Sequence, residues 1–218
     1  MARQKKTTES KTFTISVSSR KITTSWWGMA WQDKITSYSD YANRLPRARS
    51  YLRNGKVREL AIEPNFVTAK VKGTRPRPYN VQVYIEPLSD YKKQVIRQLF
   101  NEQISSVEEL LTGSFPKSLA DQFLKGDCPL FPTDDEISFY CSCPDMAYLC
   151  KHVGAVLYSI GVVFDEDPSL FFKLRNLEIG QLVQATIDER LDVYLEHASK
   201  ASERQIVASD VNEIFGEL

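Results

Sequence analysis

The sequence contains no apolar run long enough to cross a membrane. Its longest, VGAVLYSIGVVF, falls short of the roughly 20 residues that a transmembrane helix needs. The basic start MARQKKTTESKTF has no apolar stretch behind it, which argues against a secretory signal. The phosphate-binding motif G-x-x-x-x-G-K-[ST] does not occur either. We therefore expect an intracellular, cytoplasmic protein that is not a nucleotide-driven motor.

Histidine and cysteine are scarce, and their distribution is uneven. The chain has two histidines and four cysteines, yet CSCPDMAYLCKH holds three of the cysteines and one histidine. The pattern is Cys141-x-Cys143, six residues, then Cys150-x-His152. A redox site would need a Cys-x-x-Cys pair, which is absent. Clustered thiols in an intracellular protein indicate a metal before a disulfide.

The cluster matches the chemistry of zinc, which takes four tetrahedral ligands from cysteine sulfur and histidine nitrogen. We predict one structural zinc ion held by Cys141, Cys143, Cys150 and His152, with Cys150 just before a helix and His152 in its first turn. A catalytic zinc keeps an open position, which four ligands do not leave. A Cys–His nucleophile pair is conceivable but needs no further cysteines. We expect neither Cys128 nor His197 to bind metal, and we predict no enzyme activity or small-molecule substrate.

The net charge of zero conceals a strong asymmetry along the chain. Residues 1–100 carry 20 basic and 7 acidic side chains, whereas residues 101–218 carry 8 and 21. This difference favours an anionic partner for the N-terminal half, with nucleic acid the commonest candidate. The alternative is that the two halves attract each other.

The pattern of apolar residues predicts an α+β fold. Alternation over residues 57–85 predicts an antiparallel meander of three strands, with a further short strand near residues 12–18. Trp27, Trp31, Ile35 and Tyr38 recur at helical spacing after Thr24 or Ser25, so this helix is the expected cover of the meander. Tryptophans at this spacing belong to the core more often than they stack on nucleic-acid bases, so we expect them in the core. Capping signals then predict a helical middle from Ser89 onward, with helices starting at Ser89 and Ser106 and ending at Gly113.

We predict four regions along the chain. They are a partly disordered tail at 1–20, a basic α+β domain at 21–125, a zinc-finger region of strand or hairpin plus helix at 126–177, and an acidic helical segment at 178–218.

Two dense groups of arginine and lysine interleaved with tyrosine are candidate nucleic-acid contacts. They comprise Arg44, Arg47, Arg49 and Arg53 with Tyr51, and Lys70, Lys72, Arg75 and Arg77 with Tyr79. Guanidinium groups suit phosphates, and tyrosines can stack on unpaired bases. The stiff Arg-Pro-Arg-Pro stretch holds its charges outward at low entropic cost. The alternative is a solvated strand edge that discourages aggregation.

The stretch CSCPDMAYLCKHVGAVLY resembles a SWIM-type zinc finger, whose pattern is Cys-x-Cys, a variable gap, then Cys-x-His. SWWGMAW, YANRLPRARSYLRNGKV, VKGTRPRPYNVQV and DPSLFFKLR resemble prokaryotic proteins that carry one such finger. The resemblance covers roughly residues 20–177. It implies an α+β finger whose ligands are the four residues named above. It also implies binding of DNA or protein, and association with Swi/Snf-type helicase-like ATPases or recombinase-type proteins.

Two functions therefore compete. The first is a zinc-containing accessory protein that binds nucleic acid, DNA first, beside a helicase-like ATPase. The second is a protein–protein adaptor for an ATPase or recombinase. The adaptor hypothesis depends on the acidic C-terminal half and on SLFFKLRNL as an exposed apolar segment.

Overall fold

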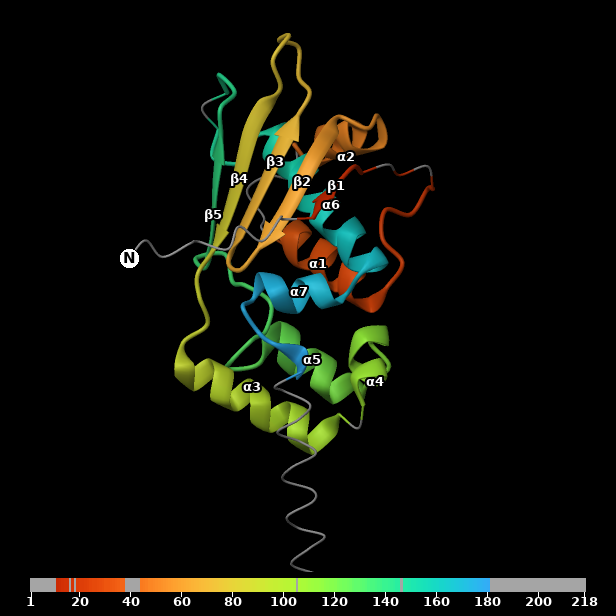
Figure 1. Ribbon diagram of the computed structural model, residues 1–218, viewed down its shortest axis with the longest axis vertical. Coiled ribbons are helices and arrows are strands. Elements are labelled where there is room, and N and C mark those ends of the chain that lie inside the picture. Colours follow the sequence, from red (N-terminus) through yellow and green to blue (C-terminus); the bar gives the residue numbers. More distant parts are fainter. Residues whose placement is uncertain are drawn as a thin grey trace, which may run out of the picture. The chain divides into compact units, whose positions relative to one another are not determined.

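The computed structural model of the protein describes residues 11–180 except 16, 18, 38–43, 105 and 146. His197, Tyr38 and most of the predicted tail and acidic segment lie outside the described residues. The predicted α+β class is confirmed, since one antiparallel sheet combines with helices on one side and at one end (Figure 1).

The sheet contains five antiparallel strands in the order β1-β2-β3-β4-β5. Their bounds are Thr12–Phe13 for β1, Val57–Glu63 for β2, Phe66–Val71 for β3, Tyr79–Ile85 for β4 and Ile137–Cys141 for β5. Burial alternates along β3 and β4, so the predicted meander has one covered face. β5 comes from the predicted zinc-finger region and pairs with β4. The meander and the finger therefore share one sheet.

Helix α6, Lys151–Glu166, covers the sheet. It packs against β2 to β5 on one side and against α1 and α2 on the other, which is why nearly all of its residues are buried. The tryptophan helix α1, Trp26–Ser37, packs mainly on α6, so our expectation that it covers the meander was wrong. Because α6 is apolar on all sides, α6 and not α1 takes the buried position against the sheet. Within the described chain, no helix combines the length and apolarity that crossing a membrane requires.

Close contact between α1 and α6 explains Gly28 in the first turn of α1. A Cβ atom there would lie 2.7 Å from the carbonyl oxygen of Gly161 and 2.1 Å from Oδ1 of Asp165. The Asp165 carboxylate accepts hydrogen bonds from the backbone N–H groups of Thr24 and Ser25 at the start of α1. The Ser25 hydroxyl in turn accepts from the Gly28 N–H at 3.0 Å, as predicted for a capping residue.

Helix α2, Leu45–Arg53, is absent from the elements predicted from the sequence. Leu45, Ala48 and Leu52 are buried against α6 at the spacing of one helical face. Proline in the first turn was the local signal for a helix start.

Four helices complete the described part of the chain. They are α3, Asp90–Gln103, α4, Val107–Thr112, α5, Lys117–Lys125, and α7, Ser169–Leu174. The predicted caps are confirmed: Ser89 accepts from the Lys92 N–H, and Ser106 accepts from the Glu109 N–H. Gly113 ends α4 with a φ of 74°, in the left-handed region.

A cluster of aromatic rings joins these helices to α1. Trp27 is fully buried and donates from Nε1 to the carbonyl oxygen of Leu110 at 2.9 Å. Rings around it come from α1, α3, α5, α7 and the loops between them: Trp26, Phe100, Phe115, Phe123, Phe131, Phe171 and Phe172. The predicted core role of the tryptophans is confirmed. The segment SLFFKLRNL is not an exposed apolar surface, because Phe171, Phe172 and Leu174 are fully buried.

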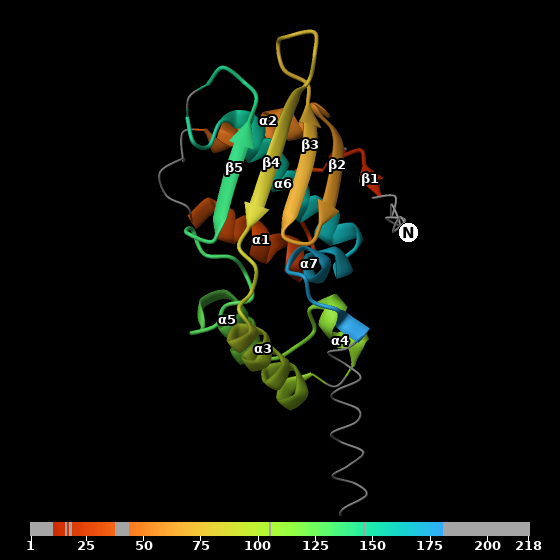
Figure 2. The ribbon, with the colours of Figure 1, turned by 60° about the vertical axis from the view of Figure 1, so that its left-hand side comes forward.

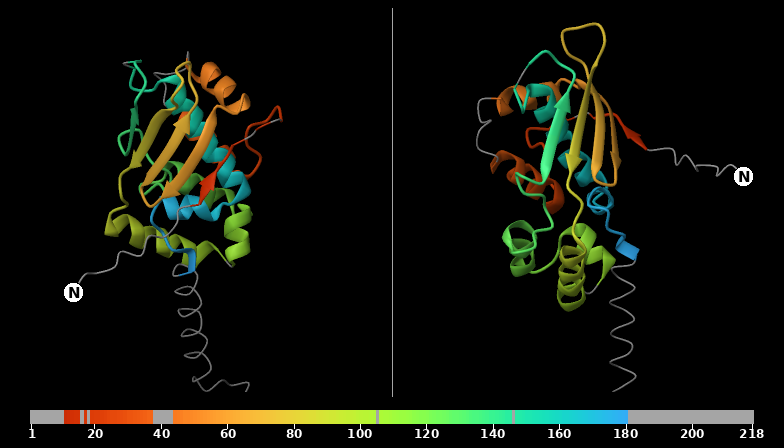
Figure 3. Two further views of the ribbon diagram at one scale, coloured as in Figure 1. Left: turned by 45° about the horizontal axis from the view of Figure 1, so that its top comes forward. Right: turned by 90° about the vertical axis from the view of Figure 1, so that its left-hand side faces the viewer.

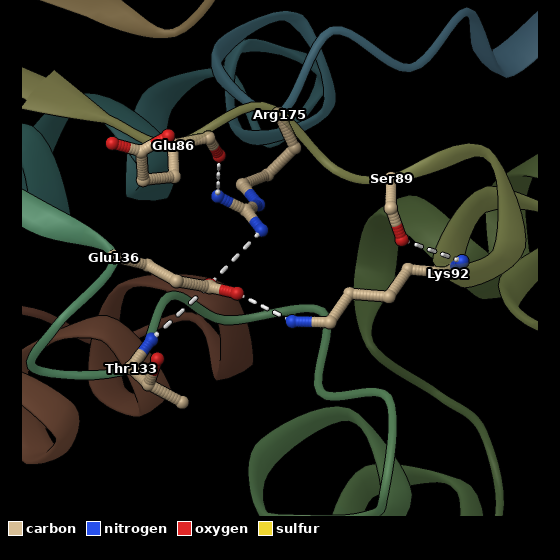
Figure 4. A network of polar contacts seen from close by, with 6 residues as sticks. All are labelled: Glu86, Ser89, Lys92, Thr133, Glu136 and Arg175. Atoms are coloured by element: carbon tan, nitrogen blue, oxygen red, sulfur yellow. Dashed lines mark hydrogen bonds and ion pairs between the residues drawn. The ribbon is translucent and has the colours of Figure 1, made fainter.

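A buried polar network lies beside this cluster (Figure 4). Arg175 is buried and donates to the backbone carbonyl of Glu86 at 3.2 Å, while its other nitrogen lies 3.5 Å from Oε2 of Glu136. Glu136 also pairs with Lys92 of α3 and accepts from the Thr133 N–H. A buried guanidinium requires such partners. The network connects α7, the end of β4, the start of β5 and the start of α3.

Candidate metal centre

The four predicted zinc ligands come from the end of β5, the following loop and the start of α6. Cys141 is the last residue of β5, and Cys143 follows it by two. Cys150 is the residue immediately before α6, and His152 lies in the first turn of that helix. All four ligand atoms lie within 4.8 Å of one another. Residues separated by up to eleven positions therefore meet at one point.

Two of the donor–donor distances are close to those around a tetrahedral ion. His152 Nδ1 lies 3.9 Å from Cys141 Sγ and 3.7 Å from Cys150 Sγ. Zinc–sulfur and zinc–nitrogen bonds of ordinary length place tetrahedral donors about 3.6–3.8 Å apart. Three sulfurs and one nitrogen are a donor set of structural zinc. The group is thus positioned to bind one zinc ion.

The protein divides negative charge unequally among the three thiols. A hydrogen bond with Cys141 and a further contact with His152 lower the pKa of Cys150 to about 4. The hydrogen bond to Cys150 and burial raise the pKa of Cys141, and burial raises that of Cys143. Without a cation the site therefore favours a single thiolate. A divalent ion would balance the charge of the other two.

Two tyrosine rings hold the imidazole of His152 from its other side. The ring centroid of Tyr79 lies 4.7 Å from that of His152, and the centroid of Tyr51 lies 5.2 Å away. His152 Nε2 is buried with no hydrogen-bond partner among the described residues. Nδ1, the nitrogen nearer the sulfurs, is thus the ring atom placed to bind the metal. Packing of the two tyrosine rings fixes the orientation of the imidazole. Sequence reasoning missed this role of the tyrosines, because no local pattern brings β4 and α2 to the histidine.

Short polar contacts fix the loop that carries Cys143. The Ser142 N–H donates to the carbonyl oxygen of Asn80, and the Ser142 hydroxyl accepts from the Asn80 N–H at 2.9 Å. Asp145 accepts from the Ala147 N–H at 3.1 Å and pairs with Arg44 at 2.6 Å. The Ala147 hydrogen bond and then Arg44 lower the pKa of Asp145. The loop thus docks on β4 and on α2.

The residues of the first basic group have different surroundings. Arg44 is paired with Asp145, as above, and Arg47 is exposed. The Arg49 guanidinium donates to the buried Tyr158 hydroxyl at 3.0 Å and lies over its ring. Arg53 donates to the carbonyl oxygen of Arg20 at 2.9 Å. Arg49 is therefore partly a structural residue.

The second basic group surrounds the β3–β4 hairpin. Lys70 pairs with Glu59 at 2.8 Å, and Lys72 donates to the carbonyl oxygens of Arg75 and Pro76. Arg75 and Arg77 are exposed and have no ion pair with another described residue. Tyr79 is only 6% exposed, and its ring lies against His152. Its ring is thus not presented to solvent.

Comparison with known proteins bears on the finger and on most of the chain. Residues 139–161 match the SWIM zinc finger family. The chain is also 34% identical over 172 residues to Uncharacterized protein Rv2102 of Mycobacterium tuberculosis (strain ATCC 25618 / H37Rv). The match covers 78% of this chain and 62% of that protein, so the chain spans less than two thirds of its length. No solved structure matches the chain.

Proposed function

The chain carries a SWIM zinc finger at residues 139–161, and from this premise we propose that it is an accessory protein that binds nucleic acid, with DNA the first choice. Its basic N-terminal half makes the contacts, and the zinc ion holds that surface in shape. The protein acts beside a helicase-like ATPase and catalyses no reaction of its own. The proposal places it in the cytoplasm, where reduced thiols can retain zinc.

One observation carries the proposal: both basic groups are anchored on the zinc site. Tyr51 of the first group and Tyr79 of the second both pack on the His152 ring. The Lys151 ammonium, inside the finger, lies 5.5 Å from the centre of the Tyr51 ring. Two segments about 25 residues apart in sequence thus lie at one end of the sheet beside the finger (Figure 1). Clustered cations on one part of a surface are the electrostatic footprint of nucleic-acid binding.

Several cations in this region are available to an anionic partner. Arg47, Arg75 and Arg77 are exposed without an ion pair to another described residue. A cleft of about 360 Å³ beside α1 and α2 is lined by four basic residues and one acidic residue, Arg20, Lys21, Arg49, Arg53 and Asp33. Guanidinium groups at such positions can form bidentate hydrogen bonds to phosphates.

The competing function is a protein–protein adaptor with no nucleic-acid contact. The segment expected to form its binding surface is not exposed. The apolar side chains of SLFFKLRNL are buried in the core instead of facing a partner. The other support for the adaptor hypothesis, the acidic C-terminal half, is described only as far as residue 180. The basic surface therefore favours the nucleic-acid hypothesis.

A binding titration at several salt concentrations tests the proposal. Zinc-loaded full-length protein is titrated into labelled single-stranded and duplex DNA. The expected result is a steep loss of affinity with salt, because each neutralised phosphate contributes about 0.7 to 0.9 to the slope of log affinity against log salt. Arg75→Ala with Arg77→Ala should weaken binding and flatten this slope by about one to two.

The matched control removes two lysines from α5, at the opposite end of the sheet. Lys117 and Lys125 are both exposed, so Lys117→Ala with Lys125→Ala changes the net charge equally. This variant should keep the parent's slope. If the parent binds no nucleic acid at low salt, the nucleic-acid proposal fails and the adaptor hypothesis replaces it.

A further inference from the structure

One face of the sheet is packed against α6, and no described helix or strand covers the other (Figure 2 and Figure 3, right). Directly opposite residues of antiparallel strands share a face, so cross-strand pairing places the outward side chains in rows. One row crosses all five strands through Thr12, Ala61, Thr68, Gln82 and Tyr140. We call this surface the open face.

Two tyrosines lie exposed on adjacent strands of the open face. Tyr84 of β4 is 40% exposed and Tyr140 of β5 is 58% exposed. Tyr84 is directly opposite Ser138, so Tyr140 is its diagonal neighbour, at a spacing of about 7–8 Å in an antiparallel sheet. Phe66 lies opposite Tyr84 on the other side and is half-buried. Exposed neighbouring aromatic rings on a sheet indicate a binding surface.

A shallow hollow of about 340 Å³ lies on the same sheet, lined by residues of β1 to β4. Its lining includes the small residues Ala61 and Thr68 and the amides Asn80 and Gln82 of β4, and Gln82 is directly opposite Tyr140. Side-chain amides offer both hydrogen-bond donors and acceptors, as the edges of nucleobases do. Along β4 the outward residues run from Asn80 through Gln82 to Tyr84, so polar groups lead to an aromatic end over about 13 Å.

The charges of the open face suit an anionic polymer. Its two carboxylates from β2 are each paired with a lysine, Glu59 with Lys70 at 2.8 Å and Glu63 with Lys173 at 3.2 Å. The hairpin that continues β3 and β4 carries the exposed Arg75 and Arg77 (Figure 1). A chain with one phosphate per unit can therefore meet cations at the hairpin and aromatic rings farther along β4.

The width of the sheet decides between duplex and single strand. Five strands at about 4.8 Å spacing span about 19 Å, whereas the major groove of B-DNA is about 12 Å wide. The open face is too wide to enter the groove of an undistorted duplex and would meet mainly its backbone. Bases reach a broad sheet when they are unpaired and turned outward.

We propose that the open face binds single-stranded nucleic acid. Bases stack on Tyr84 and Tyr140, base edges meet the amide of Gln82, and phosphates meet Arg75 and Arg77. The inference rests on the proposed function, because it specifies the form of nucleic acid and the surface that receives it.

The test measures binding of zinc-loaded full-length protein by fluorescence anisotropy. Three probes of equal length are used: oligothymidylate, oligouridylate and a DNA duplex. The two single strands separate DNA from RNA, and both should bind more tightly than the duplex. Tyr84→Ala and Tyr140→Ala should each weaken single-strand binding by about 5-fold to 100-fold, the range for loss of one stacked base. Their salt slopes should stay as in the parent, because no phosphate contact is lost.

Two controls accompany these variants. Tyr84→Phe and Tyr140→Phe retain the ring and should bind within about twofold of the parent. Tyr91→Ala removes a tyrosine that is 70% exposed on α3, away from the sheet, and should bind unchanged. Unaltered thermal unfolding of each variant shows that the fold is intact.

The outcomes separate this inference from the function on which it rests. If Arg75→Ala with Arg77→Ala weakens binding but the tyrosine variants bind as the parent, the open face is not the site and the proposed function stands. Tighter binding of the duplex than of both single strands would also overturn the inference. If no probe binds at low salt, the proposed function itself fails, and the inference with it.

Discussion

Different interactions stabilise the two ends of the sheet. At one end, which we call the zinc end, three thiols and His152 converge on a point that suits a metal ion, with Tyr51 and Tyr79 packed around the imidazole. At the other, the aromatic end, rings pack around Trp27 beside the Arg175 network. The zinc end depends on an ion and on thiol protonation, whereas the aromatic end depends on ring packing and on a buried ion-pair network that needs no metal. Removal of the metal ion should therefore act first on the zinc end.

Helix α6 connects the two ends, which makes the comparison testable within one chain. It begins beside Cys150, and Asp165 near its last turn binds the start of α1. A change at either end is thus transmitted through a helix that is almost wholly buried. Variants at one end therefore measure how far its disruption lowers the stability of the other.

The largest expected effect follows from removal of the zinc. Cys141→Ser or His152→Ala should abolish stoichiometric zinc binding and destabilise the protein by several kcal/mol, since structural zinc contributes on the order of 10 kcal/mol in finger peptides. Hydrogen exchange should rise first in β5 and the first turns of α6, and least in α3 and α5. Elemental analysis and exchange measured by mass spectrometry would check both statements.

Cys128→Ser is the matched control for these variants, because Cys128 is a half-buried thiol outside the cluster. It should retain one zinc per chain and melt close to the parent. A His152→Ala protein that melts like the parent while free of metal would show that the zinc end needs no ion.

The second effect acts on the aromatic end. Trp27→Ala removes a fully buried indole ring and the hydrogen bond to Leu110, and should cost about 3–5 kcal/mol of unfolding free energy. Zinc stoichiometry should stay at one per chain, because no ligand is touched. Denaturant unfolding and zinc analysis measure the two quantities. Met29→Ala, on the same helix but 43% exposed, should change stability little. Loss of zinc in Trp27→Ala would mean that the ends are not independent.

The smallest effect is expected from a shift of pH, which should change the affinity for zinc. Raised pKa values keep Cys141 and Cys143 protonated near neutral pH, whereas Cys150, with its pKa lowered to about 4, is already a thiolate. Zinc must then displace roughly two protons, so its affinity should rise with pH by about two decades per unit and fall on acidification. Zinc titration in weak buffer would measure the proton release. Release of fewer than one proton would contradict this assignment of thiol charge.

Local patterns in the sequence predicted much of the molecule. The Cys-x-Cys and Cys-x-His spacing identified the metal site, because ligands within twelve residues leave little conformational choice. Alternation in β3 and β4 and the caps at Ser89 and Ser106 were likewise local signals. Each of these features is determined by residues close in sequence.

The errors concern contacts between distant segments. Pairing of β5 with β4, and the packing of α1 on α6 instead of the sheet, depend on which surfaces compete for burial. The apolar segment before Arg175 belongs to the core and not to the surface, because rings from the distant helices α1 and α3 cover it. Tyr79 alternates with exposed neighbours, so the strand pattern predicts that its side chain points inward. No sequence pattern predicts its contact with His152.

The placement of the tryptophans gives the protein a built-in optical reporter. All three, Trp26, Trp27 and Trp31, belong to α1, and none lies at the zinc end. Their fluorescence therefore describes the aromatic end and, through Trp31, the contact of α1 with the middle of α6. If cobalt replaced zinc, the absorption bands of its bonds to the thiolates would report on the zinc end. Two spectroscopic signals, recorded from one unlabelled sample, would then show in which order the two ends come apart.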